Sequence, residues 1–490
     1  MNIGIDLGTT FSAVARIWQG QPEIVPNREG ERLTPSVVLI QEDGSTIVGS
    51  AAKAQAVILP HGVVTAIKNY MGTKEEFLLA DGKRYPPEVI SSYILQRLVQ
   101  DAEHFVGEHV EGAVITIPAY FTDAQRKATI DAAQLAKVPL LAVINEPTAA
   151  AVYYAKCLGE TRPMNLMIYD LGGGTFDVTI LSAKGMNIQV LSTGGLSRTG
   201  GKDLDMAIVE YVCKVFLEKH DIDLEDDEYQ DEYQDLMLKA EACKIQLSSK
   251  ESTSIPLRVG KVKENIVITR EFLETKVRKL YRRTEGIVKR ALRDAGLTSF
   301  QQLDKVVLVG GSSMIPMIQR SLHSLTGITP SMDVNPSEAV VLGAAIYADR
   351  RCAVSDVCSH SIGVSAFTRG GPVNHILISR SSRLPCQVEE SFFTMRESQA
   401  SIILTLTEGE SSDLSDVTTI SEQTIRLPAG LPVGTEVTVT LSLDTNQLLH
   451  LQLRVAAAGV CQEYEINRAQ NLDEETLRKW QGLALSKDIF

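Results

Sequence analysis

Two short segments of the chain place an aspartate at the end of an apolar run and follow it with small residues. The first reads Asp-Leu-Gly-Thr-Thr at 6–10, and the second reads Asp-Leu-Gly-Gly-Gly-Thr at 170–175. Glycine leaves the backbone N–H groups of such a turn open to an anion, and threonine adds hydroxyl donors. Tight hairpins use the same residues for steric reasons alone. Two copies, each after an acidic residue, favour a cleft that binds phosphate groups.

The two aspartates of these turns, Asp6 and Asp170, are expected to lie near each other at the base of the cleft. Mg²⁺ prefers carboxylates together with phosphate oxygens, so the pair predicts a metal site. Each carboxylate could also cap its own turn through backbone N–H groups. Phosphoryl transfer needs little covalent help from a protein. The other parts should therefore be a cation near the γ-phosphate and a group that orients the nucleophile.

The turns belong to an imperfect internal repeat, residues 2–17 and 166–181, and each copy is predicted to form a β-hairpin. A second pair of strand-to-turn units, 112–121 and 305–316, supports two duplicated half-domains because each is followed by a helical pattern. Further helical patterns cover residues 123–137, 203–219, 228–247 and 270–295. Strands that alternate with helices predict an α/β class. We interpret the acidic run at 218–235 as a solvated helix start.

The pattern changes after Arg351. Short alternating runs separated by Gly, Pro and Ser clusters predict an all-β sandwich, and helical periodicity returns at Asp473. The predicted domains are a nucleotide-binding domain at 1–350, a linker at 351–361, a β sandwich at 362–470 and a short C-terminal helix at 471–490. A chain of 490 residues also exceeds what one hydrophobic core usually serves.

The composition, with 44% hydrophobic and 22% charged residues, is typical of a globular protein. A balance of 48 Lys and Arg against 61 Asp and Glu gives a net charge of -13. This charge argues against electrostatic binding of nucleic acid or of an anionic membrane. The 7 cysteines are scattered without ligand spacing, which favours a reduced compartment. Neither a leader sequence nor a long apolar run is seen, so we expect a cytoplasmic protein without a membrane span.

Several longer motifs carry a resemblance to a known family. They are IDLGTTFSAVA at 5–15, TPSVV at 34–38, AIKNYMG at 66–72, ITIPAYFTDAQRKAT at 115–129, INEPTAAAVYY at 144–154, YDLGGGTFDVTIL at 169–181, VLVGGSSMIP at 307–316 and VNPSEAVVLGAA at 334–345. With these motifs the chain resembles the seventy-kilodalton heat-shock chaperones over nearly its whole length. The linker form DVC resembles that of the short bacterial relatives called heat shock cognate protein C.

The resemblance implies an actin-like ATPase domain with duplicated ribonuclease-H-like halves, followed by a β sandwich that resembles the family's peptide-binding domain. The implied catalytic residues are Lys68, Glu146, Asp170, Thr175 and Asp177. The implied nucleotide-contacting residues are Gly8, Thr9, Thr10, Phe11, Gly172, Gly173, Gly174, Gly200, Gly201, Glu241, Lys244, Ile245, Ser248, Gly310, Gly311, Ser312 and Met314. The implied cofactors are ATP or ADP and Mg²⁺ held by Asp6 and Asp170, with K⁺ as a further candidate cation.

The resemblance also assigns residues outside the cleft. Pro118, Arg126 and Asp356 lie where the family couples nucleotide state to its second domain. The residues that would line a groove for extended apolar peptide are Val364, Phe367, Phe392, Met395, Ile402 and Leu404. Strand augmentation with side-chain pockets is the binding mode of such a groove. Alternating apolar residues are equally what a sandwich core needs.

The chain departs from the family pattern on the adenine side. Ile245 and Met314 stand where the family stacks the base between two arginines, so cation–π stacking of about 0.5–2 kcal/mol each is lost. Phe11 replaces the usual polar residue or tyrosine. These differences predict a lowered affinity for ATP.

Other departures concern domain coupling. Ala142 replaces an arginine that many members use with J-domain partners. The linker keeps Val354 and Val357 in place of a leucine run, and the helical lid is largely absent. Bound peptide should therefore leave quickly.

The sequence thus predicts an ATP-dependent chaperone that slowly hydrolyses ATP and binds extended apolar segments of unfolded proteins. A J-domain co-chaperone and a nucleotide exchange factor are the implied partners. The alternative is a nucleotide-gated co-chaperone or interaction protein without a productive ATP cycle. A small-molecule kinase on the same fold would give the β sandwich no role, and filament formation is a further alternative.

Overall fold

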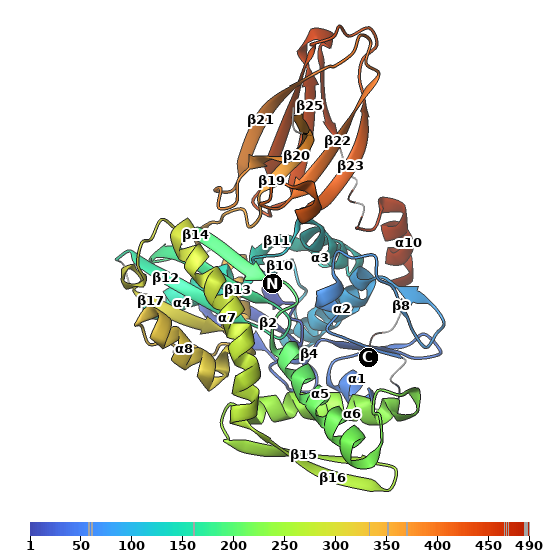
Figure 1. The fold of residues 1–490 in the computed structure, drawn as a ribbon, viewed down its shortest axis with the longest axis vertical. Coiled ribbons are helices and arrows are strands. Elements are labelled where there is room, and N and C mark those ends of the chain that lie inside the picture. The colour runs from blue at the N-terminus through green and yellow to red at the C-terminus, as the bar shows by residue number, and fades with distance from the viewer. Residues whose placement is uncertain are drawn as a thin grey trace.

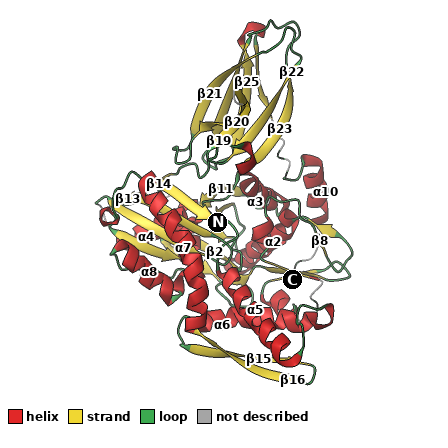
Figure 2. Cartoon of the chain, viewed as in Figure 1, coloured by secondary structure: helices red, strands yellow, loops and turns green. Residues whose placement is uncertain are grey.

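The computed structural model describes the chain except residues 57–58, 60–61, 160–161, 333, 350–351, 369–370, 465, 467, 469, 485–488 and 490. Two sheets with flanking helices form the larger part of the molecule, and a β sandwich stands on it (Figure 1). Helices flank the sheets of the larger part, whereas the sandwich consists mainly of strands (Figure 2). Within the described residues, no helix is long and apolar enough to cross a membrane.

The first half of the ATPase-like part is built on a sheet in the order β11-β10-β1-β2-β3, with β4 paired to β2. These strands are β1 (Asn2–Asp6), β2 (Phe11–Trp18), β3 (Gln21–Val25), β4 (Thr34–Pro35), β10 (Gly112–Ile117) and β11 (Leu140–Asn145). Its helices are α1 (Ser50–Gln55), α2 (Pro87–Val106), α3 (Asp123–Leu135) and α4 (Glu146–Leu158), with the 3-10 turn η2 (Ile67–Tyr70). Small sheets add β5 (Val37–Ile40), β6 (Thr46–Val48), β7 (Val63–Thr65), β8 (Phe77–Leu78) and β9 (Arg84–Tyr85).

The second half is built on a sheet in the order β17-β12-β13-β14-β18. These strands are β12 (Met164–Leu171), β13 (Phe176–Lys184), β14 (Asn187–Leu196), β17 (Lys305–Val309) and β18 (Ala353–Ser355), and β15 (Ser252–Val259) pairs with β16 (Val262–Thr269) as a separate hairpin. Its helices are α5 (Gly201–His220), α6 (Gln230–Leu247), α7 (Arg270–Asp294), α8 (Pro316–Thr326) and α9 (Ala339–Ala348). The 3-10 turns are η3 (Asp227–Tyr229), η4 (Phe300–Gln302) and η5 (Gly311–Met314).

The predicted internal repeat is confirmed by strand pairing. β1 pairs antiparallel with β2 and parallel with β10, and β12 pairs in the same way with β13 and β17. Asp6 lies at the carboxyl end of β1 and Asp170 near the carboxyl end of β12. The duplicated topology therefore brings each aspartate to the same place in its own half.

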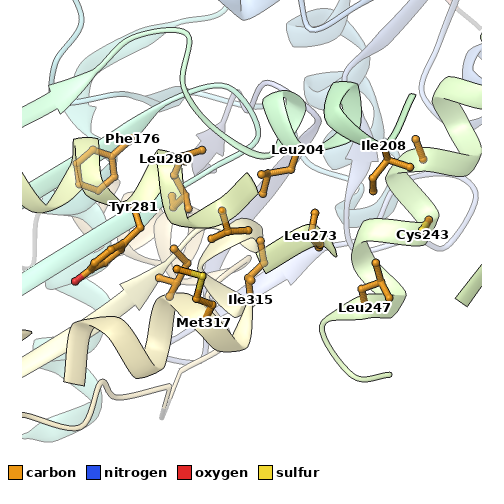
Figure 3. Packing of buried hydrophobic residues seen from close by; sticks show 14 of the residues in the cluster. Phe176, Leu204, Ile208, Cys243, Leu247, Leu273, Leu280, Tyr281, Ile315 and Met317 are labelled. Atoms are coloured by element: carbon orange, nitrogen blue, oxygen red, sulfur yellow. The ribbon is translucent and has the colours of Figure 1, made fainter. Parts of the chain in front are cut away.

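The core of the second half packs α5, α6 and α7 against its sheet. Figure 3 shows Leu204 and Ile208 of α5, Leu247 of α6 and Leu273 of α7 in this cluster. α7 continues through Gly286 as one helix, because its buried residues recur at helical spacing and hold it to the core.

The contact between α4 and α9 joins the central helices of the two halves. A β-carbon added to Gly343 would lie 1.7 Å from the backbone oxygen of Ala149, and one added to Gly4 would lie 2.3 Å from the nitrogen of Ala345. These glycines let the backbones of α4, α9 and β1 approach more closely than any side chain would allow.

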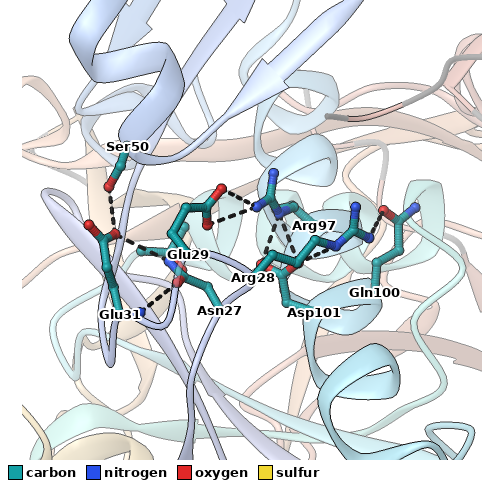
Figure 4. Close-up of polar contacts among 9 residues, drawn as sticks. Asn27, Arg28, Glu29, Glu31, Ser50, Arg97, Gln100 and Asp101 are labelled. Carbon is teal, nitrogen blue, oxygen red and sulfur yellow. Dashed lines mark hydrogen bonds and ion pairs between the residues drawn. The ribbon is translucent and has the colours of Figure 1, made fainter.

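A charged network fixes the loop between β3 and β4 on α2 (Figure 4). Arg97 of α2 donates to both oxygens of Asp101 and to both oxygens of Glu29, at 2.7–2.9 Å. Arg28 pairs with Asp101 at 2.9 Å. The adjoining Arg32 then forms a two-bond ion pair with Glu338, which precedes α9. The loop thus links the first half to the α9 region.

The segment predicted as a linker forms part of the ATPase-like sheet. Its residues Ala353–Ser355 are β18, which pairs parallel with β14. Val354 packs against the neighbouring core, and Val357 is 1% exposed. Although the leucine run is missing, the segment is docked by strand pairing, by these valines and by Asp356, which accepts from Asn145 Nδ2 and Thr148 Oγ1.

The β sandwich packs the sheet β20-β19-β22-β23 against the sheet β21-β24-β25-β26. Its strands are β19 (Ile362–Thr368), β20 (Gly371–Ile378), β21 (Cys386–Phe393), β22 (Ser401–Glu408), β23 (Thr418–Arg426), β24 (Glu436–Leu443), β25 (Leu449–Val455) and β26 (Val460–Tyr464), with the 3-10 turns η6 (Leu414–Asp416) and η7 (Ala456–Ala458). Alternating apolar residues of both sheets point into one core, as the sequence pattern predicts.

The C-terminal helix α10 (Glu474–Ala484) packs against the ATPase-like part beside α3 and α2 (Figure 1). Leu477 is buried in the core of the first half, and the Trp480 ring lies 5.2 Å from the ring of Tyr85. Asn471 and Gln481 donate to backbone oxygens at the two ends of α3, those of Ala124 and Gln134. In this structure the helix therefore anchors the chain end to the first half.

The glycine contact gives a stability prediction. Gly343→Ala should lower the free energy of unfolding by about 3 kcal/mol or more, because its methyl group would overlap the backbone of α4. Denaturant unfolding followed by circular dichroism measures this change. Gly286→Ala is the matched control: a β-carbon there meets nothing within 4 Å, and the substitution should stabilise α7 by about 0.5–1 kcal/mol. Equal stability of the two variants would contradict the prediction.

Candidate ATPase site and domain interface

The site is centred on an ion pair between Lys68 and Glu146. Lys68 lies in η2, and Glu146 is the first residue of α4. Lys68 Nζ donates to Glu146 Oε1, and the two residues are 6% and 8% exposed. Burial strengthens the attraction, since little water screens it. The structure thus brings together two residues that are 78 positions apart in the sequence.

Three aspartates surround this pair. Burial, followed by repulsion from Glu146, raises the pKa of Asp6 to about 6 and that of Asp177 to about 7. The same two causes hold the pKa of Asp170 well above its usual range. The Lys68 ammonium opposes all three shifts. Four carboxyl groups thus surround one ammonium group, as expected of a site that receives a cation.

These side chains could supply only part of the coordination of a bound Mg²⁺. Within the described residues, no group of three or more His, Cys, Asp or Glu side chains is arranged to hold a metal ion by itself. Asp6 also accepts a hydrogen bond from Thr116 Oγ1 at 2.8 Å. A cation here would depend on phosphate oxygens and water for the rest of its coordination, which is how proteins usually hold Mg²⁺.

The two glycine turns lie against each other. A β-carbon added to Gly173 would lie 2.4 Å from Thr10 Oγ1, and one added to Gly174 would lie 2.9 Å from Thr9 Cγ2. The 172–174 turn is tied to the following loop, because the N–H groups of Gly201 and Lys202 donate to its carbonyl oxygens at 3.0 and 2.8 Å. The turns that the sequence pairs are therefore adjacent in space.

Two further predicted segments join these turns. A β-carbon on Gly201 would lie 2.4 Å from Ser312 Oγ, and one on Gly200 would lie 2.7 Å from the carbonyl carbon of Gly173. Gly310 has φ +78° and leaves room for the Asp170 carboxylate, 2.6 Å from its would-be β-carbon. The other residues predicted for these loops are sequence neighbours of those just described. Gly8 lies in the first turn, Gly172 and Thr175 in the second, and Gly311 in η5.

The predicted adenine-side residues lie on α6 and η5. Lys244 donates to the oxygen of Gly201 at 3.2 Å and pairs with Asp205 at 2.8 Å. Glu241 pairs with Lys53 at 2.7 Å, and that ammonium group lies 5.3 Å from the centre of the Phe11 ring. Lys53 therefore links α1 to α6 across the two halves.

Ile245 and Met314 are both exposed, at 58% and 39%, while Ser248 caps α6. Both apolar side chains thus have surface available for a planar ligand. Their contact with adenine stays a prediction.

The predicted coupling residues Arg126 and Asp356 meet through Asn145. Arg126 is 3% exposed and donates to Asn145 Oδ1 at 3.1 Å, and Asn145 Nδ2 donates to Asp356 at 2.9 Å. Arg126 also donates to Ser359 Oγ of the segment that enters the sandwich, at 3.1 Å. Pro118 begins the loop after β10 and accepts the Phe121 N–H at 3.2 Å. The first two residues therefore lie at the domain boundary.

Several interface residues were missed by the sequence interpretation. The Asp123 N–H donates to the Glu408 carboxylate of β22 at 3.2 Å. The Asp123 side chain pairs with Arg468, which also donates to Leu449 O at 3.3 Å in the sandwich. Arg380 of the sandwich pairs with Asp294 of α7 at 2.9 Å. One signal was available: Glu408 is a charge at an inward position of the alternating strand Ser401–Glu408.

The predicted groove residues fall into two groups. Val364 and Leu404 are 0% and 6% exposed in the sandwich core, and Phe392 and Ile402 pack against that core. Phe367 and Met395 are 81% and 79% exposed. In this conformation Val364 and Leu404 are closed off from solvent, so a groove role for them stays a prediction.

Three further apolar side chains of the sandwich are exposed: Phe393, Ile403 and Val433. Their neighbours Phe392 and Ile402 were predicted instead, and successive residues of a strand point to opposite faces. β19 and β22 pair only from Ile362 to Val364, and β19 then continues with β20 alone. The two strands thus separate toward the end where Phe367 lies.

The buried Glu408 carboxyl predicts pH-dependent docking. Burial, then repulsion from Asp123, raises its pKa from the ordinary 4.5 to about 8 in the docked state. A raised pKa stabilises docking below about pH 4.5, and this stabilisation is lost as the pH rises through about 8. Docking should weaken by up to about tenfold per pH unit between pH 6.5 and 8. Small-angle X-ray scattering should show a larger radius of gyration at pH 8 than at pH 6.5.

Glu408→Gln keeps the acceptor of the Asp123 N–H without the charge. The radius of gyration of this variant should be the same at pH 6.5 and pH 8. A wild-type radius that is constant over this range would refute the prediction.

One comparison with protein-family models gives a match. The family described as Hsp70 protein matches residues 2–78 and 77–486, which covers both the ATPase-like part and the sandwich. Members of this family are chaperones with ATPase activity that bind ATP or ADP with Mg²⁺. The paired turns, the carboxylate cluster around Lys68 and the attached β sandwich agree with this match, and the chain belongs to the Hsp70 family.

Proposed function

We propose that this chain is an ATP-dependent chaperone that slowly hydrolyses ATP with Mg²⁺ and couples its nucleotide state to the binding of extended apolar peptide. The observation that carries the proposal is the buried Lys68–Glu146 pair inside a cluster of carboxylates, next to two facing glycine turns. A buried ion pair costs desolvation energy and contributes little to stability, so a functional reason for it is favoured.

The residues of the proposed nucleotide site would have separate roles. The N–H groups and hydroxyls of the turns at Thr9, Thr10 and 172–174 would hold phosphate oxygens. Mg²⁺, when bound beside Asp6 and Asp170, supplies positive charge next to the transferred phosphoryl group. Lys68 would stabilise the charge that develops in the transition state.

Orientation of the attacking water falls to Glu146, Thr175 and Asp177. Asp177 is fixed in place because its Oδ1 accepts the Tyr120 N–H at 2.9 Å. A carboxylate with a pKa of about 7 is suited to accept a proton near neutral pH.

Peptide binding is assigned to the β sandwich. Exposed Phe367 and Met395 lie near the end where β19 and β22 separate, and an extended apolar segment would cover them. Within the described residues, β19 beyond Val364 pairs with β20 alone, so its other edge offers main-chain hydrogen bonds. α10 is packed on the ATPase domain in this structure, so it leaves this end of the sandwich uncovered. We therefore expect rapid release of bound peptide.

Finer assignments are also proposals. A J-domain co-chaperone and a nucleotide exchange factor are the expected partners, and the cytoplasm is the expected compartment. The linker form favours the heat shock cognate protein C branch. The exposed Ile245 and Met314 favour weak ATP binding.

A second function, a nucleotide-gated co-chaperone without productive turnover, is favoured by one observation: exposed aliphatic side chains, not arginines, stand at the adenine side. Stimulation of ATP hydrolysis by apolar peptides would exclude it.

Loss of Lys68 tests the catalytic half of the proposal. Lys68→Met should lower kcat for Mg²⁺-dependent phosphate release by about 100-fold or more, because one preorganised electrostatic contact to the transition state is removed. ATP affinity, measured by calorimetry, should change far less. Lys83→Met is the control, since Lys83 is a solvent-exposed lysine paired with Asp81. Equal rates of phosphate release for Lys68→Met and the wild type would refute the assignment.

Removal of the exposed apolar pair tests the peptide half. The double variant Phe367→Ser, Met395→Ser should weaken binding of a fluorescein-labelled leucine-rich peptide by about tenfold or more, because both side chains would be covered by the peptide. Fluorescence anisotropy measures the affinity. Phe105 on α2 is also exposed, at 55%, and the Phe105→Ser variant should bind the peptide like the wild type. Unchanged affinity in the double variant would place the binding surface elsewhere.

A further inference from the structure

The outer side of α7 carries a stripe of positive charge, called here the basic face. Its exposed basic residues are Arg278, Lys279, Arg282, Arg283, Lys289 and Arg293. The buried residues of α7 lie on the other side of the helix and pack into the core of the second half. Lys289 pairs with Glu285 at 2.6 Å, whereas the other side chains of the basic face form no ion pair within the described part of the chain.

The folding of α7 by itself does not explain these charges. Like charges four residues apart destabilise a helix, and Arg278 and Arg282 are such a pair. Lys279 and Arg283 are a second pair. Basic residues are favoured at the end of a helix by its dipole, but this effect is confined to the last turn and covers Arg293 alone. A negatively charged partner would remove the repulsion along the helix.

The segment from the end of α5 to the start of α6 carries the opposite charge. Its exposed acidic residues are Asp221, Asp223, Glu225, Asp226, Asp227, Glu228 and Asp231, called here the acidic segment. The last two lysines of α5, Lys214 and Lys219, pair with Glu218 and Glu264 instead. Within the described residues, no basic side chain forms an ion pair with the acidic segment. The second half thus has two uncompensated surfaces of opposite sign.

A hollow between α7 and α8 adjoins the basic face. It measures about 400 Å³ and is lined by Tyr281, Glu285, Arg320, Ser321, Ser324 and Leu325. Glu285 neighbours Arg282 and Lys289 on the helix surface, since three and four residues separate them. Tyr281 is 7% exposed, and its hydroxyl points away from the other labelled core residues in Figure 3. This hydroxyl has no hydrogen-bond partner among the described residues, so an acceptor such as a carboxylate fits the hollow.

We propose that the basic face of α7 binds the acidic segment of a second copy of this chain. The charges of the two surfaces are complementary, and both are present at the same concentration wherever the protein is. Arginines outnumber lysines on the basic face, and a guanidinium group can bind a carboxylate with two parallel hydrogen bonds. Because the two surfaces differ, the contact is heterologous and can continue from copy to copy. The inference does not depend on the proposed ATPase function.

The rest of the molecule argues against larger polyanions as the occupant. A net charge of -13 would repel an anionic membrane, which approaches much more of the surface than one helix face. Single-stranded nucleic acid is usually bound where aromatic side chains stack on its bases, and the exposed positions of α7 hold no aromatic residue. A short acidic segment needs to contact only the basic face.

Sedimentation velocity of the full chain measures the association. The weight-average mass of the wild type should rise with protein concentration between about 5 and 200 µM at about 50 mM NaCl. At about 500 mM NaCl it should stay at the monomer value, because salt screens contacts between exposed charges.

Two charge reversals identify the surfaces that meet. The double variant Arg278→Glu, Arg282→Glu reverses the basic face, and Asp226→Arg, Asp227→Arg reverses the acidic segment. Each variant alone should have an association constant lowered by about tenfold or more. An equimolar mixture should return to within about threefold of the wild type, because the intact basic face of one variant meets the intact acidic segment of the other.

The matched control is the double variant Arg396→Glu, Arg426→Glu. Both arginines are exposed on the β sandwich, and their reversal changes the net charge as much as the reversal on α7 does. This protein should associate within about twofold of the wild type. Since all the substituted side chains are exposed, circular dichroism should show the same folded spectrum for every variant.

A wild type that stays monomeric at every concentration in low salt would overturn the proposal. A mixture of the two reversed variants that does not regain association would also overturn it, because the basic face would then contact some other surface. Binding of added poly-glutamate to a monomeric wild type, lost in Arg278→Glu, Arg282→Glu, would make a different acidic chain the occupant and would equally refute self-association.

Discussion

The ion pair of Lys68 and Glu146 is held in a region where negative charge is already in excess. Asp6, Asp170 and Asp177 approach the pair from the ends of strands in both halves of the ATPase domain. Removing so many charges from water is unfavourable unless a counter-charge compensates them. The close glycine contacts, the two turns and the helix pair α4 and α9 all act to bring the halves together around this cluster.

The boundary between the ATPase domain and the β sandwich is held mainly by polar contacts. Arg126, Asp123 and Asp294 each bond to a side chain of the sandwich or of the segment that enters it. Exchanging a protein partner for water changes the free energy of a polar group only slightly. Polar contacts are therefore typical of interfaces between domains that can move apart. A large apolar interface would instead hold the domains together permanently.

The C-terminal helix α10 packs on the ATPase domain through its apolar side chains. Leu477 and Trp480 bury their apolar surface against the first half, beside α3 and Tyr85. Arg468, just before this helix, bonds to both Asp123 and Leu449, so the chain end ties the sandwich to the ATPase domain. The segment predicted as a truncated lid is thus packed on the ATPase domain and not on the β sandwich.

The sequence by itself determined the duplicated halves, the paired turns and the change from α/β to β, because these depend on local periodicity and on residue types at short spacing. The motifs also singled out Lys68 and Glu146. Only the tertiary structure decided that Tyr120 joins Asp177 to His360, that Glu408 faces Asp123 and that α10 lies on α3. A strand pattern says which residues share a face, but not which domain covers that face. Such contacts join residues 57 to 347 positions apart, and their partners are set by how the packed elements and domains meet.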